Sequence, residues 1–369
     1  MMWRGYRDPS ATSYSDRPFI LIWEMTQACQ LVRRHCRAQA IPRRDPGELS
    51  TEEGRALLDA VAEMEVPVVV LSGGDPLERD DIYELIRFGT EAGLRMSTIP
   101  AASSSLTRDH VARLRDAGVA QMALSLDAPS AAVHDAFGGV PGSFWSTLEA
   151  AGWARFLGVP LQINSVLCRH TWPYFDELAT LIKELQPVLW EIFFLVPVGR
   201  ATDLASLTAT EYEEAFGKIR AVARHARFIV EVVEAPHYQR YWLERSGGAR
   251  PGCRKHGSPL GCGRMAVVRG AVGRAPAPVN AGKGFCFVSH RGEVFPSGFL
   301  PLSAGNLRSR PLAQIYRDSP LFQRLRDPDQ LKGKCGVCPY RAVCGGSRSR
   351  AFALSGDPFA AEPNCVYEP

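Results

Sequence analysis

The chain has 369 residues, and its 43 Lys and Arg against 39 Asp and Glu give a formal net charge of +4. Apolar residues make up 46% and charged residues 22%, which is ordinary for a soluble globular protein and excludes a disordered chain, a collagen or a coiled coil. A net charge of +4 over this length is too weak to indicate a nucleic acid or a membrane surface as a partner, so we expect neither.

The N-terminal arm, residues 1–16, lacks the apolar stretch of a secretory signal, and the chain has no run of about 18 apolar residues that could span a membrane. We therefore predict a cytoplasmic protein. Because cytosolic thiols are kept reduced, the ten cysteines need a role other than disulfide formation.

Residues 17–230 alternate short β-branched or aromatic runs with amphipathic runs. The pattern predicts strands at 19–24, 68–71, 95–99, 121–125, 161–166 and 191–196, and helices at 51–63, 82–92, 108–117, 144–156, 174–185 and 209–223. Parallel strands need crossover helices, so the fold class is α/β with a parallel sheet. Six such units predict a partial (β/α)6 TIM-type barrel, because a complete barrel takes about 250 residues.

The pattern changes in the last third of the chain. Residues 231–284 are rich in Gly, Pro and Arg with poor periodicity, and we interpret them as a bridging segment. Residues 285–369 begin with a predicted hairpin, 285–289 and 293–295, and continue as a Cys-rich tail. This small C-terminal domain has little core of its own, so we expect a metal to stabilise it.

The tail carries the strongest motif, a C-x2-C-x5-C-x20-C series. Its members are Cys335, Cys338, Cys344 and Cys365. Four thiolates in a loop-rich tail suit either Zn²⁺ or an iron–sulfur cluster, and the spacing does not separate the two. The alternative is four unrelated buried thiols.

A second pair of cysteines, Cys29 and Cys36, follows the first predicted strand. Active sites of barrels are built from loops at this end of the strands. Taken alone, the two cysteines could equally be incidental thiols.

Polar residues and glycines also follow the later strands. The second strand ends in Ser72-Gly-Gly-Asp75, the fourth in Ser125-Leu-Asp127, the fifth at Asn164, and Val196 follows the sixth. Each has an ordinary alternative: a tight turn for the glycines, a helix cap for Asp127, and a turn residue for Asn164. Because all of them lie at the same end of successive strands, together they indicate a binding site more strongly than each residue does alone.

The loop from Cys29 to Cys36 resembles the C-x3-C-x-aromatic-C cluster loop of radical S-adenosylmethionine enzymes, with His35 at the ring position. The resemblance implies a [4Fe–4S] cluster held by Cys29 and Cys36, and S-adenosylmethionine as a second cofactor. The implied contacts to S-adenosylmethionine are Gly73, Gly74, Asp75, Ser125, Asp127, Asn164, Val196 and His35.

The tail resembles the SPASM domain, the auxiliary-cluster module of many such enzymes. The resemblance implies one auxiliary [4Fe–4S] cluster on the four tail cysteines. Ser297 and Arg348 stand where the SPASM motif has further cysteines, so a second auxiliary cluster is not expected. The Cys344-Gly-Gly-Ser-Arg and Ser355-Gly-Asp-Pro stretches resemble haem-modifying members most.

Arg33 departs from the family pattern, since it stands where the cluster loop has its middle cysteine. A guanidinium has no acceptor and no accessible deprotonated form, so it cannot replace a thiolate on iron. We considered an inactivating substitution, engineered or natural, in an otherwise intact enzyme; a natural pseudoenzyme; and a shifted register. Under the first two, this chain holds its barrel cluster poorly or not at all.

The resemblance implies a function: reductive cleavage of S-adenosylmethionine to a 5′-deoxyadenosyl radical that modifies a tetrapyrrole-like small molecule or a peptide. An electron donor such as ferredoxin or flavodoxin would be a partner. Arg33 makes the activity of this sequence doubtful. The alternative is a non-catalytic pseudoenzyme, stapled by metal, that binds a ligand or a partner.

Overall fold

The computed structural model describes residues 14–245, 275 and 278–369. Its centre is a ten-stranded sheet with the order β10-β9-β8-β1-β2-β3-β4-β5-β6-β7. Strands β1 to β7 are parallel neighbours in chain order: β1 (Ile20–Glu24), β2 (Val68–Ser72), β3 (Met96–Thr98), β4 (Gln121–Ser125), β5 (Leu161–Leu167), β6 (Leu189–Phe194) and β7 (Ile229–Val233). Since β10 and β7 are the two ends of this order, the barrel is open.

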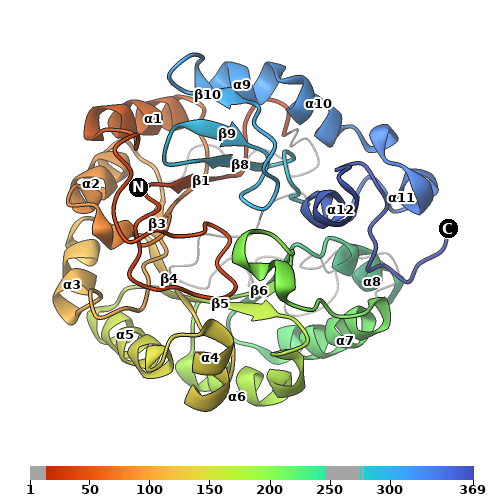
Figure 1. Cartoon of the computed structure of the whole chain (residues 1–369), viewed down its shortest axis with the longest axis horizontal. Coiled ribbons are helices and arrows are strands. Elements are labelled where there is room, and N and C mark those ends of the chain that lie inside the picture. The colour runs from red at the N-terminus through yellow and green to blue at the C-terminus, as the bar shows by residue number, and fades with distance from the viewer. Residues whose placement is uncertain (1–13, 246–274, 276–277) are drawn as a thin grey trace, which may run out of the picture.

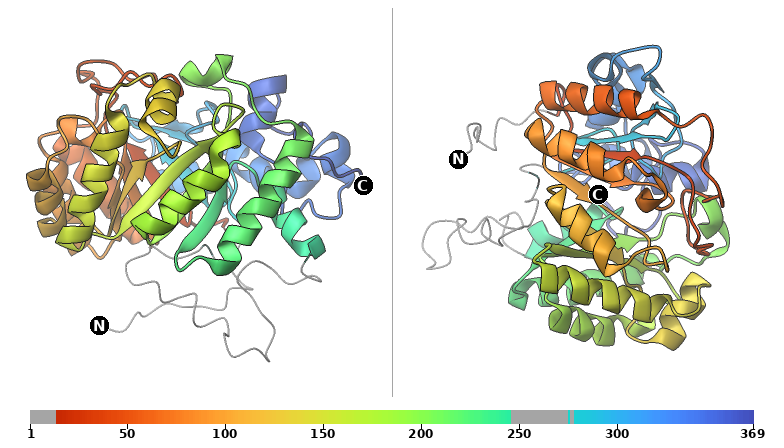
Figure 2. Two further views of the ribbon diagram at one scale, coloured as in Figure 1. Left: turned by 90° about the horizontal axis from the view of Figure 1, so that it is seen from below. Right: turned by 90° about the vertical axis from the view of Figure 1, so that its left-hand side faces the viewer.

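Helices follow the strands and form the outer layer (Figure 1). They are α1 (Thr51–Glu63), α2 (Ile82–Glu91), α3 (Arg108–Asp116), α4 (Ala131–Gly138), α5 (Ser143–Leu157), α6 (Phe175–Leu185), α7 (Ala209–His225) and α8 (His237–Arg245). Figure 2 shows α1, α2, α3 and α5 stacked side by side over the strands. Capping boxes begin three of them: Ser50 with Glu53 at α1, Thr107 with His110 at α3, and Thr208 with Glu211 at α7.

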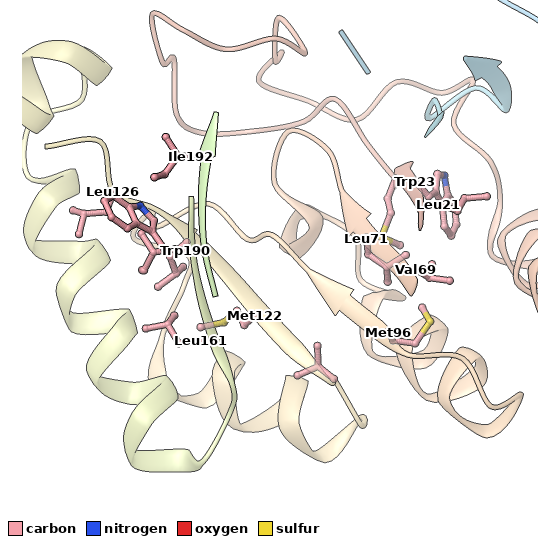
Figure 3. Close-up of a cluster of buried hydrophobic side chains, with 14 of the residues drawn as sticks. Leu21, Trp23, Val69, Leu71, Met96, Met122, Leu126, Leu161, Trp190 and Ile192 are labelled. Atoms are coloured by element: carbon pink, nitrogen blue, oxygen red, sulfur yellow. The ribbon is translucent and has the colours of Figure 1, made fainter. Parts of the chain in front are cut away.

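The two faces of the sheet differ in polarity because side chains alternate along each strand. One face of the strands presents large apolar side chains, among them Trp23, Leu71 and Trp190, to the helices (Figure 3). The opposite face carries polar groups in the barrel interior, where Gln162 bonds to Gln121 and Glu191. Thus the apolar core lies between sheet and helices, and the interior of the barrel is kept polar.

The C-terminal segment adds to the first strand of the same sheet. β8 (Phe285–Val288) pairs in parallel with β1, and β9 (Glu293–Phe295) and β10 (Gly305–Asn306) continue it as antiparallel strands. Four short helices follow: α9 (Leu312–Asp318), α10 (Pro320–Arg326), α11 (Gly333–Val337) and α12 (Arg348–Ser355). In Figure 1 this blue segment continues the outer ring between α1 and α8.

Contacts from the tail also reach the far edge of the sheet. Arg350 in α12 donates to the main-chain oxygen of Leu195, just after β6, and Asn364 donates to that of Leu207. The C-terminal segment therefore touches both edges of the open barrel, through β8 at β1 and through α12 near β6.

The fold class predicted from the sequence is confirmed, and all six predicted strands and helices are present. The sequence analysis missed β7, α4 and α8. Strand β7 carries Glu231 in a five-residue run, and α8 lies in the segment whose periodicity is poor. The predicted hairpin is present as β8 and β9. The arm up to residue 13 and most of the predicted bridging segment lie outside the described residues. The domain limits at 17, 230 and 285 stay predictions.

No helix among the described residues has the length and apolar character needed to cross a membrane.

Candidate functional site

A cavity of about 210 Å³ opens at the carboxyl ends of the strands. Of the predicted metal and cofactor contacts at this end of the barrel, Asp75 alone does not line the cavity; those that do are Cys29, His35, Cys36, Gly73, Gly74, Ser125, Asp127, Asn164 and Val196. Apolar side chains, including Ile99, Phe193 and Phe299, complete the wall. Segments that are far apart in the sequence thus meet at one hollow.

The loop between Cys29 and Cys36 is fixed by main-chain hydrogen bonds. The N–H of Cys29 donates to Ile41 O at 2.9 Å, and the N–H of Cys36 donates to Arg33 O at 3.2 Å. The Leu31 N–H donates to the Cys29 sulfur at 3.3 Å. Burial raises the pKa of the Cys29 thiol, so without a metal this sulfur is held protonated.

The glycine pair after β2 packs directly on this loop. A Cβ on Gly73, whose φ is +153°, would stand 2.5 Å from Thr26 O, and one on Gly74 would stand 2.2 Å from Ala28 O. Only glycine permits such a close approach of two backbones. The pair therefore does more than form a tight turn, because it sets the distance between β2 and the cysteine loop.

Asp75 follows the glycine pair and is fully buried. Its Oδ1 accepts the N–H groups of Leu77 at 3.1 Å and Ala101 at 3.2 Å, whereas Oδ2 has no partner among the described residues. Burial raises the pKa of Asp75 to about 6, partly offset by these two hydrogen bonds.

Asp127 is held rigidly at the end of β4. Its Oδ1 accepts the Val166 N–H at 2.8 Å, and its Oδ2 lies 3.5 Å from His35 Nε2. The His35 ring stacks on Phe137 with centroids 4.6 Å apart, and burial lowers the pKa of His35. Asp127 does not cap a helix, since the N-cap of α4 is Ser130. This leaves it available to the cavity.

Arg33 enters the same cavity from the cysteine loop. Its Nη1 donates to Ser125 Oγ at 3.2 Å, and its Nη2 is buried without a partner in the described chain. Only Cys29 and Cys36 among the described cysteines line the cavity, because Cys168 and Cys286 are fully buried elsewhere. Two thiols and a guanidinium do not fit a cluster that needs three thiolates.

The four tail cysteines line a second, smaller cavity of about 20 Å³. The Glu362 N–H donates to the Cys335 sulfur at 3.3 Å, and the Gly346 N–H donates to the Cys344 sulfur at 3.4 Å. No three His, Cys, Asp or Glu side chains in residues 14–245 and 278–369 are arranged to hold a metal ion. Four cysteines around one space are a donor set that either an iron–sulfur cluster or Zn²⁺ takes.

The two positions where the SPASM motif has further cysteines are filled by hydrogen-bonding groups. Ser297 Oγ donates to Glu234 Oε1 at 3.4 Å. Arg348 is buried, donates to the main-chain oxygens of Pro358 and Ala360 at 2.8 Å, and interacts with the thiol of Cys335. A second auxiliary cluster does not fit these residues.

Sequence reasoning missed several residues that build these sites. Phe299 belongs to the C-terminal segment yet lines the barrel cavity. Glu362 and Arg350 form a buried ion pair at 3.3 Å beside the tail cysteines. Nothing in the local sequence marks them, because their role arises only when the tail folds onto the barrel.

Comparison with known proteins agrees with this geometry. The sequence model of the Radical SAM superfamily matches residues 23–182. The chain is 39% identical to an AdoMet-dependent heme synthase of Oleidesulfovibrio alaskensis over 95% of this chain and 87% of that protein. It is 28% identical to a PqqA peptide cyclase of Rhodopseudomonas palustris over 95% and 88%. The structure of Streptococcus suis SuiB bound to S-adenosylmethionine matches with a TM-score of 0.71 at 15% identity, covering 95% of this chain and 78% of that one.

Proposed function

The chain belongs to the SPASM-type family of radical S-adenosylmethionine proteins, and from this premise we propose that its barrel is built to modify a haem-related tetrapyrrole. The heme synthase named above is more similar to this chain than the peptide cyclase is, which favours a tetrapyrrole over a peptide. A peptide is the second candidate. The family uses a [4Fe–4S] cluster and S-adenosylmethionine.

The observation that carries the proposal is the convergence of the predicted contact residues, all except Asp75, on one cavity. We assign the amino group of S-adenosylmethionine to the Gly73–Gly74 turn with Asp75, its carboxylate to Ser125, its ribose to Asp127, and its adenine to the backbone at Val196. In the family the cluster supplies the electron for cleavage of S-adenosylmethionine; here Cys29 and Cys36 would hold it only with a third thiolate at position 33. The protein supplies position, charge and exclusion of water.

The tail is proposed to hold one auxiliary [4Fe–4S] cluster on its four cysteines. Arg240 and Lys334, which line the same cavity, place positive charge near Cys365. Basic side chains of this kind offset the negative charge of a thiolate-ligated cluster. We place the protein in the cytoplasm, with ferredoxin or flavodoxin as the electron donor.

We also propose that the chain as it stands is impaired, because Arg33 occupies the third ligand position of the barrel cluster. The competing proposal is a non-catalytic pseudoenzyme whose tail is stabilised by a bound metal. The two proposals differ in whether the barrel cleaves S-adenosylmethionine once a cysteine stands at position 33.

The variant Arg33→Cys tests the proposed function. After anaerobic reconstitution and reduction, it is expected to form 5′-deoxyadenosine from S-adenosylmethionine and to alter a haem-related tetrapyrrole, as measured by mass spectrometry. The unchanged chain should give neither product. Arg33→Ser is the matched control, since it removes the guanidinium without adding a thiolate. A variant Arg33→Cys that binds a second cluster but cleaves nothing would support the pseudoenzyme.

A further inference from the structure

Arg33 carries a charge that the described chain leaves unbalanced. Its Nη1 reaches a hydroxyl, Ser125 Oγ, and its Nη2 is buried without a partner. No carboxylate of the described residues lies within ion-pair distance of Arg33. A partly buried guanidinium in this state is costly, so the site favours an anionic group from outside the chain.

One carboxylate lines the same pocket and another lies nearby. Asp127, which lines the cavity, faces His35 at 3.5 Å, a contact too long for a strong hydrogen bond. Asp75 is outside the lining, but its Oδ2 is buried without a described partner, and it is close enough to Arg33 for the two charges to influence one another. The lining therefore offers one cationic donor, Arg33, and one carboxylate able to accept, Asp127.

This mixture of charges selects the class of ligand. A plain anion such as phosphate would meet Arg33 but would be repelled by Asp75 and Asp127. A zwitterion satisfies both, with its carboxylate on Arg33 and its ammonium toward the carboxylates. The backbone at Val196, assigned above to the adenine, lines the same cavity.

We propose that Arg33 turns the barrel mouth into a cluster-free receptor for the α-amino-acid head of S-adenosylmethionine or S-adenosylhomocysteine, with the guanidinium binding the carboxylate that iron would otherwise bind. The inference rests on the proposed function, because both place S-adenosylmethionine in the barrel cavity. What it adds is that the chain binds this ligand without cleaving it. Arg33 is thus a ligand-binding residue in its own right.

The test is binding of S-adenosylhomocysteine to the full chain, with its tail cluster loaded and the iron content measured, by isothermal titration calorimetry. Removing one charge-assisted hydrogen bond, as in Arg33→Ala, should weaken binding by about tenfold or more. Arg33→Lys should lose less than Arg33→Ala. The matched control is Arg34→Ala. Arg34 is the exposed neighbour of Arg33, so its replacement should leave the affinity unchanged.

A second probe isolates the amino-acid head. 5′-Methylthioadenosine carries the same nucleoside without carboxylate or ammonium, so its affinity should be weaker and equal in the unchanged chain and Arg33→Ala. Equal binding of both probes by the unchanged chain, or undiminished binding of S-adenosylhomocysteine by Arg33→Ala, overturns the inference. Cleavage by Arg33→Cys together with such a result would refute this inference and leave the proposed function standing.

Discussion

Arg33 and Arg348 are two arginines at positions where the family motifs have cysteines, and each lies beside a cysteine that remains. Arg33 lies near enough to Cys29 for its charge to lower the pKa of that thiol, against the larger raising effect of burial. Arg348 interacts with Cys335, and Glu362, whose charge also acts on Arg348, is paired with Arg350. The consequences differ, because the tail keeps four cysteines and the barrel loop keeps two.

Arg348 is expected to set the reduction potential of the tail cluster. A buried cation beside a cluster ligand favours the reduced, more negative state, so Arg348→Met should shift the midpoint potential to lower values by tens of millivolts. Arg348→Lys keeps the charge and should shift it less. Redox titration followed by electron paramagnetic resonance measures both.

Arg310→Met, at an exposed residue that does not line the tail cavity, is the matched control for that titration. Equal potentials in the unchanged chain and in Arg348→Met, with the cluster fully loaded in both, would show that Arg348 serves only to hold the backbone at Pro358 and Ala360.

Glu191 gives the barrel interior a pH-dependent stability. Burial, with Glu231 alongside, raises its pKa to about 8 from an ordinary value near 4.5. A carboxyl with a raised pKa in the folded state favours folding at low pH, and this contribution is lost as the pH rises from about 4.5 to about 8. Glu191→Gln should therefore raise the thermal midpoint more at pH 8.5 than at pH 5.

The exposed Glu184→Gln serves as the control, and it should change the midpoint equally little at both values of pH. Differential scanning fluorimetry between pH 5 and pH 8.5 measures the thermal midpoints of both variants. A gain that is the same at pH 5 and pH 8.5 would mean that Glu191 is already ionised in the folded protein.

At the scale of elements, the turn after β2 and the cysteine loop after β1 form one packed unit. Gly74 donates its N–H to Thr26 O at 2.8 Å while its Cα faces Ala28 O, so an added methyl group forces the two backbones apart. Gly74→Ala should lower the free energy of unfolding by about 1–3 kcal/mol, as overpacking does. Urea denaturation measures it.

A glycine elsewhere provides the comparison for that prediction. Gly152 lies on an exposed face of α5 with nothing within 4 Å of an added Cβ, so Gly152→Ala should be neutral or stabilising by up to about 1 kcal/mol. Similar losses in both variants would mean that the close approach at Gly74 is not what constrains this turn.

The same elements show how far a sequence can be interpreted. Alternation and capping boxes predicted α1 to within a residue, because Ser50 and Glu53 act locally. The strand-end residues could be predicted to share a site because parallel strands end on one side. Phe299 and Arg350 could not be found, because their contacts join segments more than a hundred residues apart.

At the scale of the whole molecule, the tail completes an open barrel and is tied to it by buried polar groups. Glu234, at the end of β7, accepts hydrogen bonds from Ser297, Ser347 and Ser349. Arg350 joins Glu362 to the main chain after β6. Since Glu362 also donates its N–H to Cys335, the tail cluster site and the barrel edge share one network.

Because of this continuity, we expect the fold to be kept whether or not the barrel holds a cluster. The apolar core lies outside the sheet, and the tail site is separate from the barrel cavity, so neither depends on a third ligand at position 33. What the substitution changes is the chemistry of one cavity.

The most direct measurement is the iron and acid-labile sulfide content per chain after anaerobic reconstitution, for the unchanged protein and for Arg33→Cys. We predict about four irons in the unchanged chain, all in the tail, and about eight in the variant, as one and two [4Fe–4S] clusters require. About eight irons in the unchanged chain, with cleavage of S-adenosylmethionine, would contradict the account.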